Sequence, residues 1–241
     1  MSTPSESSLP SFGLSGFKYT QPPNPSWTFG QPITATEMSY ALSISAIGPR
    51  PIAFVSSIAE NRDENLAPFS WFNQVNPLPI SVACTRSFRR GKDTANNIKA
   101  TKGFTVNIIS EAWVEQANVC SIDAPPGVSE WTFSGLTKEP SVSVKAARVK
   151  ESAFTLECEL LQIVEVNSGA VATDLILGTV KYIHVRNAVL NERGLVDPAK
   201  LKAVGRMGDT TFVRIGDGFR IPRPSWTQEK NELEEKFNIS Q

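Results

Sequence analysis

The chain has 241 residues, with 24 Lys and Arg, 24 Asp and Glu and one His, so its formal net charge at pH 7 is zero. This balance argues against a dedicated nucleic-acid binder, which normally carries a basic excess, and against a polybasic membrane-surface protein. The amino-terminal residues lack the basic and apolar segments of a secretory signal. We therefore expect a cytoplasmic protein with no nucleic-acid partner and no membrane partner.

Residues 1–32 hold six of the 17 prolines together with many Ser and Thr. Such a composition cannot bury much apolar surface and predicts an amino-terminal arm. Residues 33–224 are expected to form the main domain, and residues 225–241 a charged carboxy-terminal helix.

The main domain alternates short helical patterns with extended ones. Helices are predicted at 37–47, 93–102, 111–122 and 199–207, with a helical turn at 129–133. Strands are predicted at 52–58, 65–73, 80–84, 104–109, 154–166, 175–185 and 211–215. Because the strands do not alternate regularly with helices, an antiparallel barrel is the simplest architecture.

Several common catalytic motifs are missing from the sequence. There is no Gly-x-Gly-x-x-Gly after a strand, no P-loop and no His-Glu-x-x-His. Cys84, Cys120 and Cys158 lie far apart, which favours buried thiols over a disulfide framework or a zinc site. The single histidine, His184, lies within a predicted strand, where we expect it to be bonded structurally within the sheet.

The residues that favour a ligand gather between positions 49 and 108. Arg89-Arg90-Gly91-Lys92-Asp93-Thr94 places three cations and a hydroxyl at the start of a predicted helix, which is a favourable place for phosphate. Residues 65–73 mix small residues, aromatic rings and amides, as would suit a flat ring with polar edges. Together the two segments favour a nucleotide-like ligand, although a solvated turn and core aromatics would explain them too.

The sequence resembles a known family at several ordered motifs. Pro-Arg-Pro-Ile-Ala-Phe-Val-Ser-Ser (49–57), Asn-Leu-Ala-Pro-Phe-Ser-Trp-Phe-Asn (65–73), Lys-Asp-Thr-Ala-Asn-Asn-Ile (92–98) and Phe-Thr-Val-Asn-Ile (104–108) are similar to those of the flavin reductase-like, FMN-binding split-barrel family. The likeness extends from about residue 40 to residue 224. It implies a mainly β fold with short helices, built as a six-stranded antiparallel split barrel, and a homodimer.

The resemblance also implies which residues bind FMN. Ser56 and Ser57 would lie beside the isoalloxazine and the ribityl chain. The backbone of the next segment would meet the edge of the ring, and two residues after it would contact the ring side; these positions are Ala67, Pro68, Phe69 and Ser70, then Phe72 and Asn73. The phosphate-binding turn would comprise Arg90, Lys92, Asp93 and Thr94, with Asp93 expected to cap the helix.

This sequence departs from the family pattern at three places. Asn76-Pro77-Leu78-Pro79 breaks a common Pro-Pro pair, Trp71 stands where Phe is commoner, and the extra arginine at 89–90 leaves open which arginine reaches the phosphate. The loops at 125–131 and around 206–211 are expected to set substrate specificity.

The implied activity is an FMN-dependent oxidoreductase. NADH or NADPH would reduce the flavin, and electrons would pass to an acceptor or to a partner oxygenase. Two alternatives remain open: an FMN-dependent enzyme that acts directly on one small organic substrate, and a non-catalytic FMN-binding protein. The sequence assigns no catalytic residue, which is compatible with chemistry carried by the flavin.

Overall fold

The computed structural model describes residues 30–34, 40–86, 92–125, 127–168, 171–216, 218–219 and 221–238. The chain divides into two units, Pro32–Gly216 and a second that joins Met1–Gln31 to Asp217–Gln241. In the second unit, α6 (Trp226–Phe237) is a polar helix with an ion pair between Lys230 and Glu234 at 3.5 Å. None of the helices in the described ranges is long and apolar enough to span a membrane.

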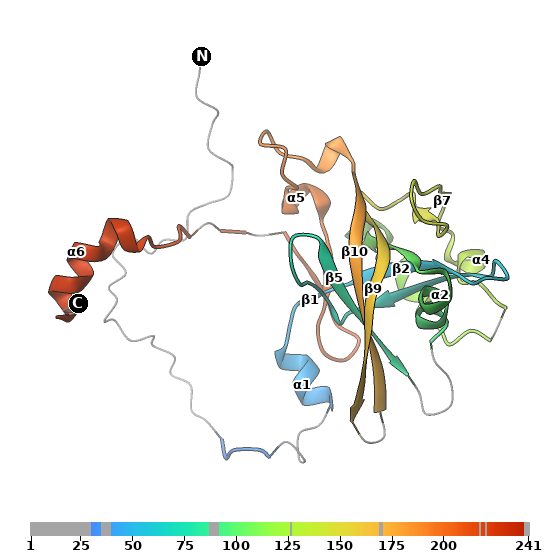
Figure 1. Ribbon diagram of the computed structural model, residues 1–241, viewed down its shortest axis with the longest axis horizontal. Helices are drawn as coiled ribbons and strands as arrows, with labels where there is room; N and C mark the ends of the chain where they lie inside the picture. Colours follow the sequence, from blue (N-terminus) through green and yellow to red (C-terminus); the bar gives the residue numbers. More distant parts are fainter. Residues whose placement is uncertain are drawn as a thin grey trace. The chain divides into compact units, whose positions relative to one another are not determined.

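A seven-stranded antiparallel sheet forms the body of the first unit (Figure 1). Its strand order is β3-β2-β6-β9-β10-β5-β4. In chain order these strands are β2 (Ala53–Ile58), β3 (Glu64–Phe69), β4 (Phe72–Gln74), β5 (Pro79–Arg86), β6 (Gly103–Ile108), β9 (Phe154–Ser168) and β10 (Val171–Val185). Figure 1 shows β5, β9 and β10 side by side, as their pairing requires.

The sheet curls because its two edge strands are neighbours in the chain. β3 and β4 lie at opposite edges, yet only Ser70 and Trp71 separate them. A two-residue link cannot cross a flat seven-stranded sheet, since adjacent strands lie about 4.8 Å apart. The edges therefore approach each other, which confirms the predicted mainly β split barrel. The structure divides the single strand predicted at 65–73 into β3 and β4 at this link. The main sheet therefore has seven strands instead of the six predicted.

Both faces of β2 are buried, which explains its nearly continuous apolar sequence. Ala53 and Val55 face the barrel interior, where they pack with residues of β5, β6, β9 and β10. Helix α2 (Asp93–Thr101) adds Ala95 and Ile98 to the same cluster. Phe54 points to the other face, into a second cluster formed with short helices and loops.

The second apolar cluster holds the remaining elements against the outside of the barrel. It includes residues from η1 (Glu111–Trp113), α3 (Val114–Val119), α4 (Trp131–Ser134), β8 (Arg148–Val149), β11 (Val204–Arg206) and β12 (Phe212–Arg214). β8 pairs with β7 (Lys138–Glu139), and β11 lies between β12 and β1 (Arg50–Pro51) in a three-stranded sheet. The other short helices are α1 (Tyr40–Ala46), η2 (Asn187–Val189) and α5 (Pro198–Leu201).

The helix predicted at 199–207 is present only at its start, as α5, and the rest of the prediction is wrong. Asp197 caps α5 by accepting a hydrogen bond from the Ala199 N–H at 2.9 Å, and the helix ends at Leu201 because Lys202 is left-handed, with φ of 51°. The following residues form β11 instead, since pairing with β1 and β12 satisfies their backbone groups. The helix predicted at 111–122 is likewise shorter, a 3₁₀ turn followed by α3.

Candidate functional site

Six of the predicted flavin-site residues line one small cavity of about 110 Å³. Three come from the end of β3 and three from the start of α2, two segments that are far apart in the sequence. They are Ala67, Pro68, Phe69, Lys92, Asp93 and Thr94. The loop after α3 and the residue before α4, Glu130, complete the wall. The fold thus joins the predicted ring-edge segment to the predicted phosphate turn.

The start of α2 offers several groups suited to an anion. Lys92, and not Asp93 as expected, occupies the N-cap position and makes no side-chain capping bond. The N–H groups of the first helical turn and the helix dipole favour negative charge there. The Lys92 ammonium lies 3.5 Å from the carboxylate of Asp123, and both side chains are at least half exposed. Because an exposed pair of this kind is weak, an incoming anion can compete for the lysine.

Thr94 is held in place by a buried amide. Its Oγ1 accepts a hydrogen bond of 2.7 Å from Nδ2 of Asn65, which lines the same cavity. The threonine hydroxyl keeps its own proton for donation to another acceptor. Arg90, the fourth member of the predicted phosphate turn, lies outside the described residues.

Ser56 and Ser57 are buried in β2 and do not line this cavity. Ser57 Oγ accepts a hydrogen bond from Nδ2 of Asn97 in α2 at 3.2 Å. Ser56 Oγ is buried without a hydrogen-bond partner. Ser57 pairs across the sheet with Asn65, so the two serines lie one strand away from the cavity wall. Their contact with a flavin stays a prediction.

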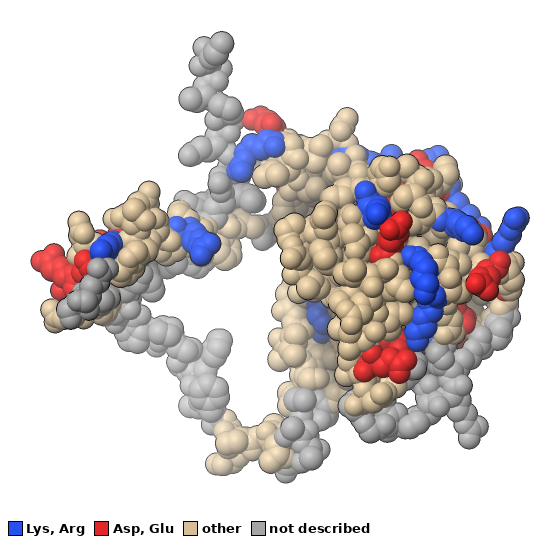
Figure 2. Space-filling view, in the orientation of Figure 1, with Lys and Arg blue, Asp and Glu red and all other residues tan. Residues whose placement is uncertain are grey.

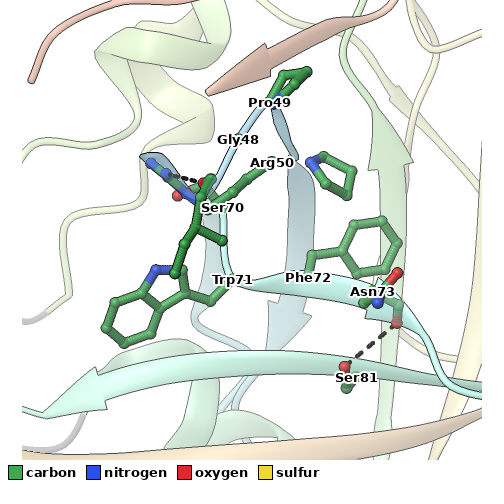
Figure 3. Close-up of a pocket in the computed structure, with 10 residues that line it drawn as sticks. Gly48, Pro49, Arg50, Ser70, Trp71, Phe72, Asn73 and Ser81 are labelled. Carbon is green, nitrogen blue, oxygen red and sulfur yellow. Dashed lines mark hydrogen bonds between the residues drawn. The ribbon is translucent and has the colours of Figure 1, made fainter. Parts of the chain in front are cut away.

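The other predicted ring contacts line a second, larger cavity of about 390 Å³ (Figure 3). Ser70, Phe72 and Asn73 share it with Trp71, with Ser81 of β5 and with residues 47–51. Figure 3 shows the side chains of Trp71 and Phe72 pointing to opposite sides of the chain. The Asn73 carbonyl accepts a hydrogen bond from Ser81 Oγ at 3.4 Å, which ties this wall to β5.

Arg50 is the one charged residue in the described lining of this larger cavity. Its guanidinium donates to the carbonyls of Ile44, Ile47 and Met207 at 2.6–2.8 Å. Within the described ranges it has no carboxylate partner, and its Nε is buried without an acceptor. Among the described contacts, the positive charge of this wall faces only neutral carbonyls. Arg50 belongs to the family-like motif at 49–57, but nothing in the sequence indicated that it lines a cavity.

Glu130 is a site residue that the sequence reasoning missed. Its side chain is 6% exposed, and Oε2 accepts a hydrogen bond of 3.0 Å from the N–H of Leu66. Burial raises the pKa of this carboxyl above its ordinary value, and the Leu66 N–H opposes the change. The available signal was its place within the 125–131 loop, which is expected to set substrate specificity.

The edge of β3 shows which backbone groups a ligand can reach. Leu66 donates away from β2, so the alternating residues Ala67 and Phe69 direct their N–H groups toward β2 in this antiparallel register. Pro68 has no N–H. Of the four residues predicted to meet the ring edge through their backbone, only Ser70, which follows the strand, keeps an N–H that pairing with β2 does not use.

Two other reactive side chains in the described ranges, those of Cys120 and His184, lie in surroundings that favour a structural role. Cys120 lines the small cavity, but burial raises the pKa of its thiol to about 12 and keeps it protonated. His184 Nε2 lies 2.7 Å from Glu157 Oε1, which confirms a histidine bonded structurally within the sheet. No group of three His, Cys, Asp or Glu residues in the described ranges could hold a metal ion.

Comparison with known proteins identifies the family. The model of the flavin reductase-like domain matches residues 46–202, about two thirds of the chain. The chain belongs to the flavin reductase-like family. An uncharacterized protein of Aquifex aeolicus is 38% identical over 179 residues, which cover 73% of this chain and 89% of the relative.

Solved structures are similar over most of the chain. Nitrilotriacetate monooxygenase component B from Bacillus cereus superposes with a TM-score of 0.76 at 30% identity, over 81% of this chain and 100% of that protein. The 2-nitrobenzoate 2-nitroreductase of Pseudomonas fluorescens gives 0.72 at 26% identity, over 81% and 98% of the two chains. A protein with a split barrel domain from Shewanella frigidimarina gives 0.69 at 19% identity, over 81% and 100% of the two chains, which supports the split-barrel fold.

Proposed function

We propose that the protein is an FMN-dependent oxidoreductase that takes hydride from NADH or NADPH and passes electrons to an acceptor. One observation carries this proposal: residues 67–73 run continuously from the small cavity with Lys92 to the larger cavity with aromatic walls. A single ligand with a phosphate at one end and a flat ring at the other would follow such a segment. Membership of the flavin reductase-like family supports FMN as that ligand.

The sizes and donors of the two cavities fit the two ends of FMN. Whole drug-sized ligands occupy cavities of roughly 300–1,000 Å³. The small cavity, at about 110 Å³, suits a phosphate group, and Lys92 and Thr94 would hold it. The larger cavity, at about 390 Å³, suits the ring system beside Phe72 and Asn73.

When bound, FMN would supply hydride transfer and electron storage, which no described side chain can provide. The residues of this chain would bind and orient it. The Ser70 N–H and the Arg50 guanidinium would favour negative charge developing at a polar ring edge in the larger cavity. No acid or base needs to be assigned for the electron transfer itself.

A second candidate function retains FMN as the cofactor but differs in the molecule that accepts the electrons. The similarity to a nitroaromatic-acid reductase, at 26% identity, supports direct reduction of one small organic substrate. The similarity to a monooxygenase component, at 30% identity, supports delivery of electrons to a partner oxygenase. Free flavin should stimulate NAD(P)H oxidation if reduced flavin is released, whereas 2-nitrobenzoate should stimulate it if the protein reduces such compounds itself.

We also propose that the protein forms a homodimer. The long hairpin of β9 and β10 exposes several large hydrophobic side chains, and their contact with water is unfavourable. They are Leu161, Val164, Val166, Tyr182, Ile183 and Val185. Figure 2 shows broad uncharged areas between the charged side chains on the face that carries these strands. The mass in solution tests this proposal, and a monomer carrying a full complement of FMN would refute it.

The first experiment is the visible spectrum of the purified protein, followed by anaerobic addition of NADPH and then NADH. We expect one FMN per chain that is bleached rapidly by at least one of them. Flavin that stays oxidised with both would favour a non-catalytic FMN-binding protein. A colourless protein that also fails to bind added FMN would refute the proposed function.

A double variant tests the phosphate cavity. Lys92→Ala with Thr94→Ala removes two or three hydrogen bonds to a phosphate, each worth on the order of 1–3 kcal/mol. We expect FMN affinity to fall at least about tenfold, while riboflavin affinity, which involves no phosphate, barely changes. Lys150→Ala, at an exposed lysine in a turn outside the cavity, is the control. An equal loss for both ligands would contradict this assignment.

A further inference from the structure

A buried acid lies in the cavity that we assign to the phosphate. Glu130 lines it together with Lys92 and Thr94. The volume of about 110 Å³ equals that of a sphere about 6 Å across. A phosphate held there would therefore lie on the order of 6 Å or less from the residues that line the cavity, Glu130 among them.

The carboxyl group of Glu130 is fixed in position. Oε2 accepts the N–H of Leu66 at 3.0 Å, a donor on the free edge of β3. The backbone of Glu130 precedes the first turn of α4, and its carbonyl accepts the N–H of Ser134 at 2.9 Å. The side chain is thus held from both ends and cannot swing into solvent without leaving the Leu66 N–H unpaired.

The described lining of the cavity brings more acidic than basic groups near this carboxyl. The ionisable groups in the described lining are one ammonium, Lys92, three carboxyls, Asp93, Asp123 and Glu130, and the thiol of Cys120, whose raised pKa keeps it neutral. Asp93 opposes ionisation of Glu130, and Lys92 favours it. Within the described lining, an ionised Glu130 would thus add to the negative charge that a phosphate meets.

We propose that Glu130 takes up a proton when the phosphate of FMN enters the cavity, so that FMN binding weakens as the pH rises. The proposal rests on the proposed function, because it requires FMN with its phosphate in this cavity. Protonated Glu130 keeps its carbonyl oxygen for the Leu66 N–H and gains an O–H that can donate to a phosphate oxygen. A group that would repel the ligand thereby becomes a donor to it.

The size of the effect follows from the distance. Two unit charges about 6 Å apart, at an effective dielectric constant of about 20, repel enough to raise a carboxyl pKa by about two units. Linkage then requires FMN affinity to fall by up to about 100-fold from low to high pH. The steepest part of the fall is about tenfold per pH unit, between the pKa of Glu130 in the free protein and that in the complex.

The test is calorimetric titration of FMN and of riboflavin into the full-length protein, in buffers of different ionisation enthalpy, from about pH 5 to about pH 8. The difference between buffers counts the protons taken up. We expect FMN binding to take up as much as one proton per site in the wild type, and riboflavin binding to take up none. In Glu130→Gln, whose amide oxygen still accepts from Leu66, the uptake should vanish and FMN affinity at high pH should rise.

Two comparisons isolate Glu130 from other titrating groups. The phosphate of free FMN titrates near pH 6. Because the free ligand is the same in both titrations, the ratio of the two affinities removes that contribution. Asp123→Asn changes an exposed carboxyl in the same lining and should keep the proton uptake.

The possible results separate the two proposals. Equal proton uptake in the wild type and in Glu130→Gln would overturn the role of Glu130 while leaving FMN binding intact. Equal affinities for FMN and riboflavin would place the phosphate elsewhere and overturn it too. Failure to bind any flavin would overturn both the role of Glu130 and the proposed function.

Discussion

From its surroundings we predict that Glu157 makes a large and pH-dependent contribution to the stability of the folded protein. This β9 carboxylate is fully buried and accepts the N–H groups of Val142 and Ser143 at 2.8 and 2.7 Å and the Ser143 hydroxyl at 2.9 Å. His184 Nε2 lies 2.7 Å away on β10. One side chain therefore fastens the loop that joins β7 to β8 onto the barrel.

The magnitude follows from the pKa of this carboxyl. Burial alone would raise the pKa of Glu157, but the hydrogen bonds outweigh it and lower the pKa from 4.5 to about 2. At 1.36 kcal/mol for each unit, the ionised form stabilises the folded protein by on the order of 3 kcal/mol. Because the folded pKa is the lower one, this contribution is complete above about pH 5 and is lost as the pH falls toward 2.

Replacing Glu157 with Gln removes the charge and sets an amide N–H₂ against groups that are themselves donors. We expect the free energy of unfolding, measured with urea, to fall by about 3 kcal/mol at pH 7. The difference between the variant and the wild type should shrink steadily below about pH 4.

A neighbouring residue provides the control. Glu159→Gln, two residues further along β9, disrupts an exposed pair with Lys181 at 3.2 Å and should change stability by less than about 1 kcal/mol. The reasoning fails if Glu157→Gln costs less than about 1 kcal/mol at pH 7. It also fails if the loss is the same at pH 7 and pH 3, because a lowered pKa requires the two to differ.

Two further substitutions test the packing of the barrel by urea unfolding. Gly178→Ala would place a Cβ 2.5 Å from Cζ of the buried Phe104 and should destabilise the protein by about 1–3 kcal/mol, whereas Gly216→Ala, with nothing within 4 Å, should be nearly neutral. Asn107→Leu would remove four buried hydrogen bonds, three of which tie β6 to β2, β8 and β9, and we expect a loss of at least about 3 kcal/mol. A loss under 1 kcal/mol would show that these groups find other partners.

Several elements could be predicted because their signals are local. The long hairpin of β9 and β10 follows from two extended apolar segments, and α2 begins and ends close to the predicted residues. The structural bonding of His184 could be predicted from its place within an extended segment. The helix predicted at 199–207 failed because its local pattern was overridden by pairing of β11 with strands that lie far away in the sequence.

The two cavities depended on contacts that no local pattern reports. Arg50 enters the larger cavity because its guanidinium links the end of α1 to Met207, 157 residues away. Glu130 enters the small cavity because the free edge of β3 offers the N–H of Leu66. In each case an unsatisfied backbone group elsewhere in the chain decides where a charged side chain lies.

The sequence by itself determined the family resemblance, the mainly β architecture and the segments that could bind a phosphate and a flat ring, since residue type and order carry those properties. Only the tertiary structure decided that residues 67–73 connect two cavities of different size, and that an acid shares the smaller one with Lys92. The physical reason is the curl of the sheet. Two residues between β3 and β4 bring its edges together, and that closure sets which distant side chains share a wall.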